Sequence, residues 1–372
     1  MKAAVLHEFG KPLRIEDVPK PEPAADEVLV KVEACGVCHS DLHIMQKDWP
    51  DAAAALQLPA ILGHEVVGRV VETGQGVADL AVGDRVGVGW LHWTCGECEC
   101  CHGGHENLCV ERKITGFAAP GGYAEYMRAK ASHAIRVPEE LSPANAAPFF
   151  CAGVTAFHAC QEASIVAGQH VAVFGVGGLG HLALQIVQEL GAKTTAVDLS
   201  EDKLQVARSM GVHQAVDASH QDAAKLLAAD GGPHVAVVTA TTEAAYDLAL
   251  RTLRRRGTLV VVGLPSQALR LVADDIATGE FRILGSAVGT RDDLQRTLEM
   301  AAAGNLICHT EAFPLEAIND IFIRMQRNEM SGRAVVSCGV DLGRSEAFSC
   351  WPRRRGSARR VGRPSGLLVG VR

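Results

Sequence analysis

The sequence lacks three features that are typical of membrane, secreted and nucleic-acid-binding proteins. No uninterrupted stretch of about 18 apolar residues offers a transmembrane helix. The apolar run within residues 1–8 is too short for a signal peptide. An excess of positive charge is also missing: the net charge is −7, and because residues 341–372 hold eight arginines against two acids, residues 1–340 carry −13. We therefore expect a cytoplasmic protein that binds neither membrane nor nucleic acid.

Length and composition predict a folded chain of two domains, followed by a C-terminal segment of different composition. The 372 residues exceed one average domain, and 48% hydrophobic with 21% charged residues suffices for packed cores. Residues 341–372 change to Arg, Gly and Ser without a period, which predicts a disordered Arg-rich tail. Within that tail, the apolar run Leu367–Val369 leaves a role at a sheet edge or subunit interface open.

The twelve cysteines are expected to include metal ligands rather than disulfides, because the cytoplasm keeps thiols reduced. Four of them follow the spacing C-x₂-C-x₂-C-x₇-C within residues 94–110, namely Cys95, Cys98, Cys101 and Cys109. Four thiolates on a short Gly-rich lobe indicate a closed, tetrahedral structural zinc site. Cys100 is a fifth thiol in this lobe, and we interpret it as a bystander.

A second concentration of reactive side chains spans Cys35–His43, after short alternating segments that predict a small antiparallel β-barrel. Two buried thiols in a strand-to-turn region would be the plain alternative. A catalytic zinc needs three protein ligands and an open position, so further ligands must come from elsewhere. The segments Gly63-His64-Glu65 and Cys151–Thr155 are the candidates.

From His170 onward, strands alternate with helices, which predicts a parallel sheet with right-handed crossovers. The first turn carries the G-x-G-x-x-G pattern of a dinucleotide site, with candidate contacts at Gly175, Gly177, Gly178, Leu179 and Gly180. An ordinary Gly-rich turn is the alternative. Asp198 ends the second strand, 18 residues past the last glycine, where a carboxylate accepts ribose hydroxyls and repels a 2′-phosphate. NAD is therefore predicted over NADP.

Read together, these segments resemble the zinc-dependent medium-chain alcohol dehydrogenases, of the bacterial, tetrameric type. The resemblance covers residues 1 to about 340 and implies an α/β fold: a doubly wound Rossmann sheet plus a GroES-like β-barrel catalytic domain. The implied domains are residues 1–149, with the zinc lobe 94–110, then 150–285 for the dinucleotide, and 286–340 returning to the first domain. Gly121–Tyr126 is similar to a family strand that returns to the barrel.

The resemblance also assigns roles at the site. It implies a catalytic zinc held by Cys38, His64 and Cys151, with Glu65 tuning the metal and Cys35 left to packing. Asp41 is our candidate to orient the zinc-bound histidine. Proton relay is implied for Ser40 and His43, the latter through the cofactor ribose, and a small substrate pocket for Trp49 and Trp90. Further cofactor contacts are implied for His39, Thr155, Lys203, Val262 and Arg333.

Some alternatives stay open at this point. Lys203 can be merely solvated, and Arg333 can form a surface salt bridge. The implied reaction is the reversible oxidation of primary or secondary alcohols to aldehydes or ketones with NAD. The implied enzyme is a homo-oligomer, with a tetramer favoured over a dimer, and each chain holds one catalytic and one structural zinc ion. Three alternative functions also stay open. They are a polyol or sugar dehydrogenase, a zinc-free quinone reductase, and a nucleic-acid-binding protein that uses the Cys₄ lobe and the Arg-rich tail.

Overall fold

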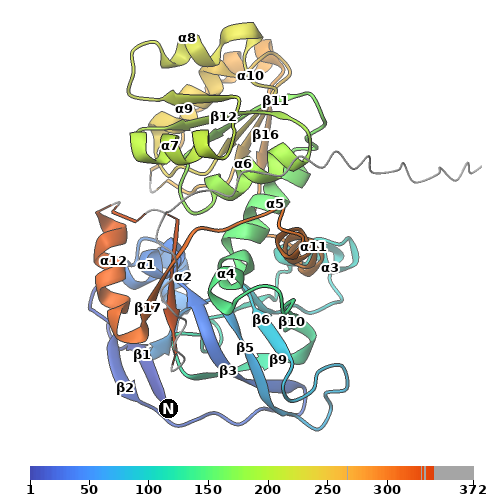
Figure 1. Cartoon of the computed structure of the whole chain (residues 1–372), viewed down its shortest axis with the longest axis vertical. Helices are drawn as coiled ribbons and strands as arrows, with labels where there is room; N and C mark the ends of the chain where they lie inside the picture. The colour runs from blue at the N-terminus through green and yellow to red at the C-terminus, as the bar shows by residue number, and fades with distance from the viewer. Residues whose placement is uncertain (266, 328, 331, 339–372) are drawn as a thin grey trace, which may run out of the picture.

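The computed structural model describes residues 1–338 except 266, 328 and 331. Figure 1 shows two bodies, an upper one built on a parallel sheet and a lower one built mainly on antiparallel strands. The predicted tail, 341–372, lies outside the described residues. Within the described part of the chain, no helix combines the length and the hydropathy needed to cross a membrane.

The lower body contains a seven-stranded sheet with the order β10-β6-β5-β3-β18-β17, and β9 pairs with β3. These strands are β3 (Glu27–Gly36), β5 (Glu65–Thr73), β6 (Arg85–Val88), β9 (Tyr126–Lys130), β10 (Ile135–Arg136), β17 (Thr310–Pro314) and β18 (Arg333–Ser337). The smaller sheets contain β1 (Lys2–Leu6), β2 (Arg14–Asp17) and β4 (Ala60–Ile61), and β7 (Leu91–Trp93) with β8 (Lys113–Ile114). All pairs are antiparallel except β17 with β18.

The end of the described chain returns to its beginning. Strand β18 pairs with β3, with Val336 opposite Cys35, so that the first and last parts of the chain share one sheet. Figure 1 shows the red-orange α12 (Ile318–Gln326) and β17 against the blue N-terminal strands. Phe322 of α12 and Val30 of β3 bury their side chains in the same core. Burial of such apolar area is the main force that closes this body.

The upper body is a six-stranded parallel sheet with the order β13-β12-β11-β14-β15-β16. Its strands are β11 (His170–Phe174), β12 (Lys193–Asp198), β13 (Gln214–Asp217), β14 (Val235–Val238), β15 (Thr258–Val261) and β16 (Arg282–Gly285). The helices between them are α6 (Gly180–Glu189), α7 (Glu201–Ser209), α8 (Ala223–Leu227), α9 (Glu243–Thr252) and α10 (Ala273–Gly279), with the short η4 (Ala229–Gly231). The strand order changes direction at β11, where doubly wound sheets bind their ligands.

The remaining helices lie in the lower body or between the two bodies. They are α1 (His39–Gln46), α2 (Pro50–Ala55), α3 (Glu99–His102), α4 (Pro143–Ala146), α5 (Ala152–Glu162) and α11 (Arg291–Ala302), with η1 (Glu106–Leu108), η2 (Ala131–His133), η3 (Ala147–Phe150) and η5 (Leu315–Ala317). Helix α5 packs against both α6 and α11. It therefore joins the cofactor sheet to the lower body.

One predicted strand is wrong in its position. Gly121–Tyr126 was expected to be a strand, but β9 begins only at Tyr126. The preceding residues donate instead to the loop before β5: Gly121 N–H to Ile61 O and Tyr123 N–H to Leu62 O. A Cβ at Gly121 would lie 2.3 Å from Gly63 O, so glycine permits a close backbone approach that a regular strand would not make.

Candidate active site

Four buried side chains from three segments of the chain meet below the parallel sheet. Cys38 caps α1, His64 precedes β5, Glu65 begins β5, and Cys151 caps α5. Their possible ligand atoms all lie within 4.8 Å of one another. The Sγ atoms of Cys38 and Cys151 are 3.8 Å apart. Two Zn–S bonds of about 2.3 Å at a tetrahedral angle require roughly the same separation, so the donors fit zinc.

The surroundings of Cys38 favour the form of this thiol that binds metal. A hydrogen bond from the Cys151 thiol and the positive charge of Arg333 hold the pKa of Cys38 well below its ordinary value, against the effect of burial. The thiolate is the form that binds metal. His64 is fully buried, and its Nε2 has no hydrogen-bonding partner among the described residues. Buried polar atoms are nearly always satisfied, so this nitrogen fits a ligand position.

Asp41 contacts the ring of His64, as the sequence analysis predicted for the residue that orients this histidine. Its Oδ1 lies 3.3 Å from His64 Nδ1 and accepts the Gly63 N–H, while its Oδ2 accepts the Tyr123 hydroxyl at 2.8 Å. Burial lowers the pKa of His64, but Asp41 and Cys38 together raise it to about 10. The contact at Nδ1 meets the distance of an ion pair but not the geometry of a hydrogen bond, and it leaves Nε2 as the nitrogen available to the cluster.

Tyr123 was missed by the sequence analysis as a functional residue. It is fully buried, and its hydroxyl contacts Asp41 from 82 positions further along the chain. No local pattern signals such a contact. The segment around Tyr123 was interpreted as architecture, and the structure shows that this architecture also supports the histidine.

Arg333 connects the metal cluster to the glycine-rich turn. It forms a buried ion pair with Glu65, with 5% and 0% of the two side chains exposed. A Cβ at Gly178 would lie 2.5 Å from Arg333 Cδ, so the arginine packs directly against the turn. The alternative of a surface salt bridge is therefore wrong, because β18 carries Arg333 into the interior. Its Nε has no partner among the described residues, which leaves a donor for an anion.

The residues predicted for proton transfer lie on one side of α1. Ser40 and His43 are three positions apart, so they share a helix face. Ser40 Oγ is 3.6 Å from Cys38 Sγ. His43 Nδ1 is 2.7 Å from Asp48 Oδ2, and its ring lies 5.1 Å from that of Trp49. The exposed His39 precedes them on the same helix.

Aromatic rings border the metal cluster. Trp90 makes an edge contact with His64, with ring centroids 4.9 Å apart. Phe117 lies 5.1 Å from Trp90 and 6.0 Å from His64. Sequence reasoning predicted Trp90 and missed Phe117, which follows β8 in a loop without a recognisable motif. Together these rings leave little room for polar groups beside the histidine.

The glycine-rich turn follows β11 and leads into α6. Gly175 has a φ of +92°, a conformation that glycine adopts at no steric cost. A Cβ at Gly180 would lie 1.7 Å from Gly175 O, whereas one at Gly177 would meet nothing within 4 Å. The turn is thus tight where helix and strand pack and open where phosphates would approach. Leu179 caps α6.

Asp198 lies at the end of β12, beside this turn. Its Oδ2 accepts the Val176 N–H at 2.7 Å, and its Oδ1 accepts the N–H groups of Leu199 and Ser200. These bonds fix the carboxylate at the carboxyl edge of the sheet. Lys203 follows in the first turn of α7, and Val262 follows β15 at the same edge. Thr155 lies on α5, where its backbone N–H donates to Cys151 O at 2.9 Å.

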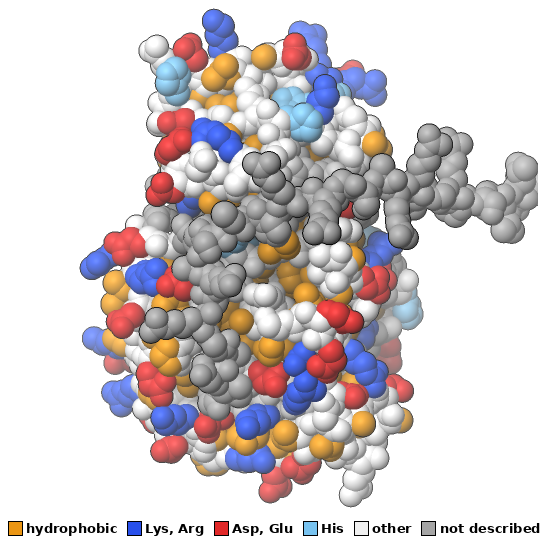
Figure 2. Space-filling view, viewed as in Figure 1, with side chains coloured by type: hydrophobic (Ala, Val, Ile, Leu, Met, Phe, Trp, Pro, Cys, Tyr) orange, Lys and Arg blue, Asp and Glu red, His pale blue; other side chains and the backbone are white. Residues whose placement is uncertain are grey.

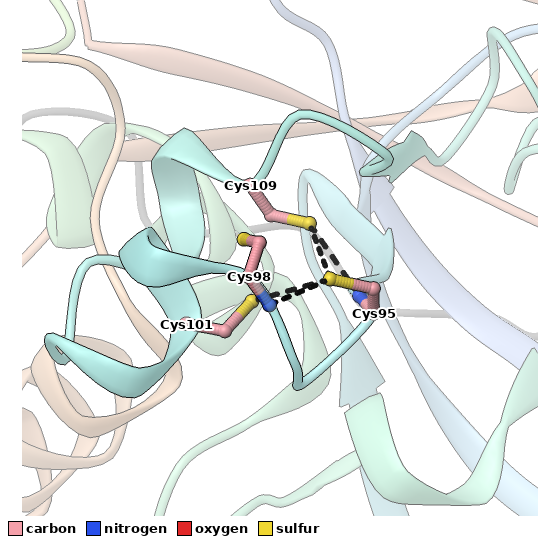
Figure 3. Close-up of side chains that lie close together, drawn as sticks. All are labelled: Cys95, Cys98, Cys101 and Cys109. Atoms are coloured by element: carbon pink, nitrogen blue, oxygen red, sulfur yellow. Dashed lines mark hydrogen bonds between the residues drawn. The ribbon is translucent and has the colours of Figure 1, made fainter.

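The second thiol cluster forms the lobe between β7 and β8. Figure 3 shows the sulfur atoms of Cys95, Cys98, Cys101 and Cys109 around one point. Cys95 Sγ is 3.9 Å from Cys101 Sγ and 3.5 Å from Cys109 Sγ, which again suits a tetrahedral metal. Cys100 is not among the clustered thiols, which supports its interpretation as a bystander.

Comparisons with known proteins identify the family of this chain. The family models described as Alcohol dehydrogenase GroES-like domain and Zinc-binding dehydrogenase match residues 24–139 and 178–303. An alcohol dehydrogenase of Geobacillus stearothermophilus is 45% identical over 90% of this chain and 99% of its own length. The chain belongs to the zinc-dependent medium-chain alcohol dehydrogenases.

Solved structures of this alcohol dehydrogenase family share the whole architecture. The alcohol dehydrogenase of the archaeon Aeropyrum pernix has a TM-score of 0.84 at 35% identity, with 91% of this chain and 100% of that chain covered. An acetophenone reductase of Geotrichum candidum, solved in complex with NAD, has a TM-score of 0.82 at 32% identity, with 90% and 96% covered. The predicted fold, a Rossmann sheet with a GroES-like domain, is therefore confirmed.

Family membership makes the chain an alcohol-oxidising enzyme that uses zinc and a nicotinamide cofactor. The alternatives of a zinc-free quinone reductase and of a nucleic-acid binder lose their support. Figure 2 shows acidic and basic side chains interspersed over the visible face, without a continuous basic patch on the described residues there. Such a mixed face does not attract a polyanion.

Proposed function

We propose that this alcohol dehydrogenase oxidises small primary or secondary alcohols reversibly with NAD, using one catalytic and one structural zinc per chain. The catalytic ion is held by Cys38, His64 and Cys151, with Glu65 beside it. The proposal rests chiefly on the 3.8 Å pair of thiols beside the unpartnered Nε2 of His64. Because the sequence resembles the bacterial, tetrameric type of this family, we also propose that the enzyme is a homotetramer in the cytoplasm.

The catalytic roles follow from the positions of the side chains. When bound, zinc supplies a Lewis acid that lowers the pKa of an alcohol. Ser40 Oγ, close to Cys38, accepts the alcohol proton and releases its own proton through the cofactor ribose toward His43. His43 then passes a proton to solvent through Nε2, because its Nδ1 is engaged by Asp48. The aromatic rings of Trp49 and Trp90 keep water away from the reacting carbon.

The cofactor proposal assigns each end of NAD to a part of the sheet edge. The N–H groups of Gly177, Gly178 and Leu179 receive the diphosphate at the start of α6, with Arg333 as the cationic partner and His39 as a further hydrogen-bond donor. Asp198, held by three backbone N–H groups, accepts the adenosine ribose hydroxyls. Lys203 adds a donor there. Val262 and Thr155 are proposed to contact the nicotinamide end.

A polyol or sugar dehydrogenase of the same superfamily is the second candidate function. Its substrate would need several hydrogen-bonding groups beside the reacting carbon. The rings of Trp90 and Phe117 occupy that space next to His64 instead. Burying hydroxyls against such rings without partners costs free energy, which favours small, mostly apolar alcohols.

A substrate screen that follows NADH absorbance tests the proposal. Short linear and secondary alcohols, glycerol, sorbitol and glucose are supplied with NAD or NADP to zinc-loaded enzyme. We expect the highest kcat/KM with short alcohols and NAD. A preference for sorbitol or glucose would replace the proposed substrate class, and a preference for NADP would refute the assignment of Asp198.

A further inference from the structure

Two buried side chains of α6 bind the segment that leads into β17 of the lower body. Figure 1 shows α6 on the side of the upper body that faces the lower one. Gln185, with no exposed surface, pairs with the backbone of Ile307: its Nε2 donates to Ile307 O and its Oε1 accepts the Ile307 N–H, both at 2.9 Å. One turn earlier, His181 is 2% exposed, and its Nε2 accepts the His309 N–H at 3.4 Å. Helix α6 is therefore tied to residues 307–309 at two points.

The imidazole of His181 makes two contacts that together require it to be neutral. Its Nδ1 lies 2.9 Å from the carbonyl oxygen of Gly177, which can only accept, so the proton is on Nδ1. Its Nε2 then carries the lone pair that the His309 N–H needs. Burial lowers the pKa of His181 to about 4, which agrees with a neutral side chain. One histidine thus links the glycine-rich turn to the lower body.

The residue that His181 holds is also bound to the strand that carries Arg333. His309 O accepts the Arg333 N–H at 2.8 Å, at the point where β17 and β18 begin to pair. The backbone is closely packed here, because a Cβ at Gly332, whose φ is +78°, would lie 2.4 Å from His309 O. The N–H and the carbonyl group of a single residue, His309, therefore connect His181 with Arg333.

The contacts then return to the turn where they began. The Arg333 side chain packs on Gly178, where a Cβ would lie 2.5 Å from Arg333 Cδ and 3.1 Å from its Nη1. Gly178 directly follows Gly177, the residue that His181 contacts. The turn and His181 belong to the upper body, whereas His309 and Arg333 belong to the lower one. Supporting contacts of this kind hold binding groups in their productive positions.

We propose that His181 is a positioning residue that sets the affinity of this enzyme for its dinucleotide. The two halves of the proposed diphosphate site come from different bodies, the N–H groups of the turn from the upper one and the Arg333 guanidinium from the lower one. His181, through His309, keeps the guanidinium at the turn. This inference rests on the proposed function, because it needs the diphosphate to bind between the turn and Arg333.

The test measures the NADH affinity of the zinc-loaded enzyme by fluorescence titration in two single variants and in their double variant. His181→Ala removes the contact with His309, and Arg333→Ala removes the guanidinium. We expect His181→Ala to raise Kd for NADH by about fivefold, the size of one lost hydrogen bond, and Arg333→Ala to raise it by about tenfold or more. The double variant should lose little more than Arg333→Ala alone, because His181 acts through Arg333.

Two conservative variants separate the two contacts of the imidazole. A glutamine amide reaches about as far as histidine Nε2, and an asparagine amide about as far as Nδ1. His181→Gln therefore keeps an acceptor for His309, whereas His181→Asn keeps only a donor for Gly177. We expect His181→Gln to bind NADH within about twofold of the wild type and His181→Asn to resemble His181→Ala.

Gln188→Ala is the matched control. Gln188 lies on the same helix and also donates to a backbone carbonyl, Met210 O, but this contact stays within the upper body. The control should keep the wild-type Kd for NADH. A loss in Gln188→Ala equal to that in His181→Ala would mean that any weakened contact of α6 lowers the affinity, and the inference would be wrong.

Three further outcomes separate the claims. If the losses of His181→Ala and Arg333→Ala multiplied in the double variant, His181 would support the turn without acting through Arg333, which would refute the inference. An unchanged Kd in both His181→Ala and His181→Asn would also refute it. If Arg333→Ala bound NADH like the wild type, the proposed diphosphate contact would fail first, and the inference would fall with it.

Discussion

Asp198 is held in one orientation before a cofactor binds. Three backbone N–H groups donate to its two carboxylate oxygens. We propose that a carboxylate fixed in this place discriminates between NAD and NADP by charge as well as by hydrogen bonding. The effect of Asp198 on the choice of cofactor can therefore be tested by substituting this residue alone.

Asp198→Ser is expected to reverse or narrow the cofactor preference. Removal of the negative charge should raise KM for NAD and lower KM for NADP, since a 2′-phosphate is no longer repelled. Steady-state kinetics with both cofactors measures the ratio. Asp217, at the corresponding end of the neighbouring β13, offers the control Asp217→Ser, which should keep the wild-type ratio. A wild-type enzyme that already prefers NADP would contradict the prediction.

His43→Gln is expected to slow alcohol oxidation most below neutral pH. The variant cannot carry a proton from the Ser40 side of α1 to solvent, and this transfer is hardest when product protons are abundant. Exogenous amine buffers should partly restore the rate. Asp48→Asn tests the partner of the histidine and should give a milder loss. If no buffer rescued His43→Gln, the histidine would be structural.

The sequence predicts site residues well when their signal is local. The thiol spacing and the G-x-G-x-x-G turn each lie within a few residues, so the type and the interval of side chains already restrict the chemistry. The supporting contacts bridge large separations: Tyr123 with Asp41 and Arg333 with Glu65. Nothing near either residue encodes its partner, because the tertiary fold alone brings them together.

At the scale of single elements, the two thiol clusters differ in what surrounds them. The Cys38 cluster is assembled by α1, β5 and α5, which pack into a large core without it. The lobe of residues 94–110 contains only α3, η1 and loops, and apart from Cys109 its thiols are partly exposed. Such a short segment depends on its metal for structure.

Cys38→Ala and Cys95→Ala should therefore fail in different ways. Cys38→Ala is expected to abolish turnover with a small change in melting temperature, whereas Cys95→Ala should lower the melting temperature by several degrees. Metal analysis should find two zinc ions per wild-type chain and one in each variant. Cys100→Ala is the control and should keep both. One zinc or none in zinc-replete wild-type protein would contradict the prediction.

Strands and helices of the cofactor domain follow closely from the sequence, because buried parallel strands are short apolar runs between turn residues. The predicted segments at Val171–Phe174 and Gln214–Asp217 agree with β11 and β13 to within a residue. The error at Gly121–Tyr126 arose because the local pattern resembles a strand although the segment makes a long-range contact. Its glycines let the backbone pack closely against the residues before His64, and this contact exists only in the assembled fold.

For the whole molecule, three buried histidines make stability depend on pH. Burial lowers the pKa of His92, His133 and His181 to about 4 in each case. In the unfolded chain the value is about 6.5. Between about pH 6.5 and pH 4 the unfolded state binds more protons, so each such histidine lowers the unfolding free energy by about 1.4 kcal/mol per pH unit of acidification.

His92→Gln is accordingly expected to flatten this dependence. Urea unfolding at a series of pH values should show a slope smaller by about 1.4 kcal/mol per pH unit between about pH 6 and pH 4.5. Loss of zinc in acid affects the variant and the wild type alike and cancels in the difference. His220→Gln, at a side chain 59% exposed, is the control. Parallel slopes for His92→Gln and wild type would contradict the burial argument.

Within the described residues, the chain passes between the two bodies twice, once at Cys151 before α5 and once after β16 near Val288. A rigid rotation of one body relative to the other that keeps both connections intact must turn about the line that joins them. Because Cys151 is itself a proposed zinc ligand, such a rotation would displace this ligand least.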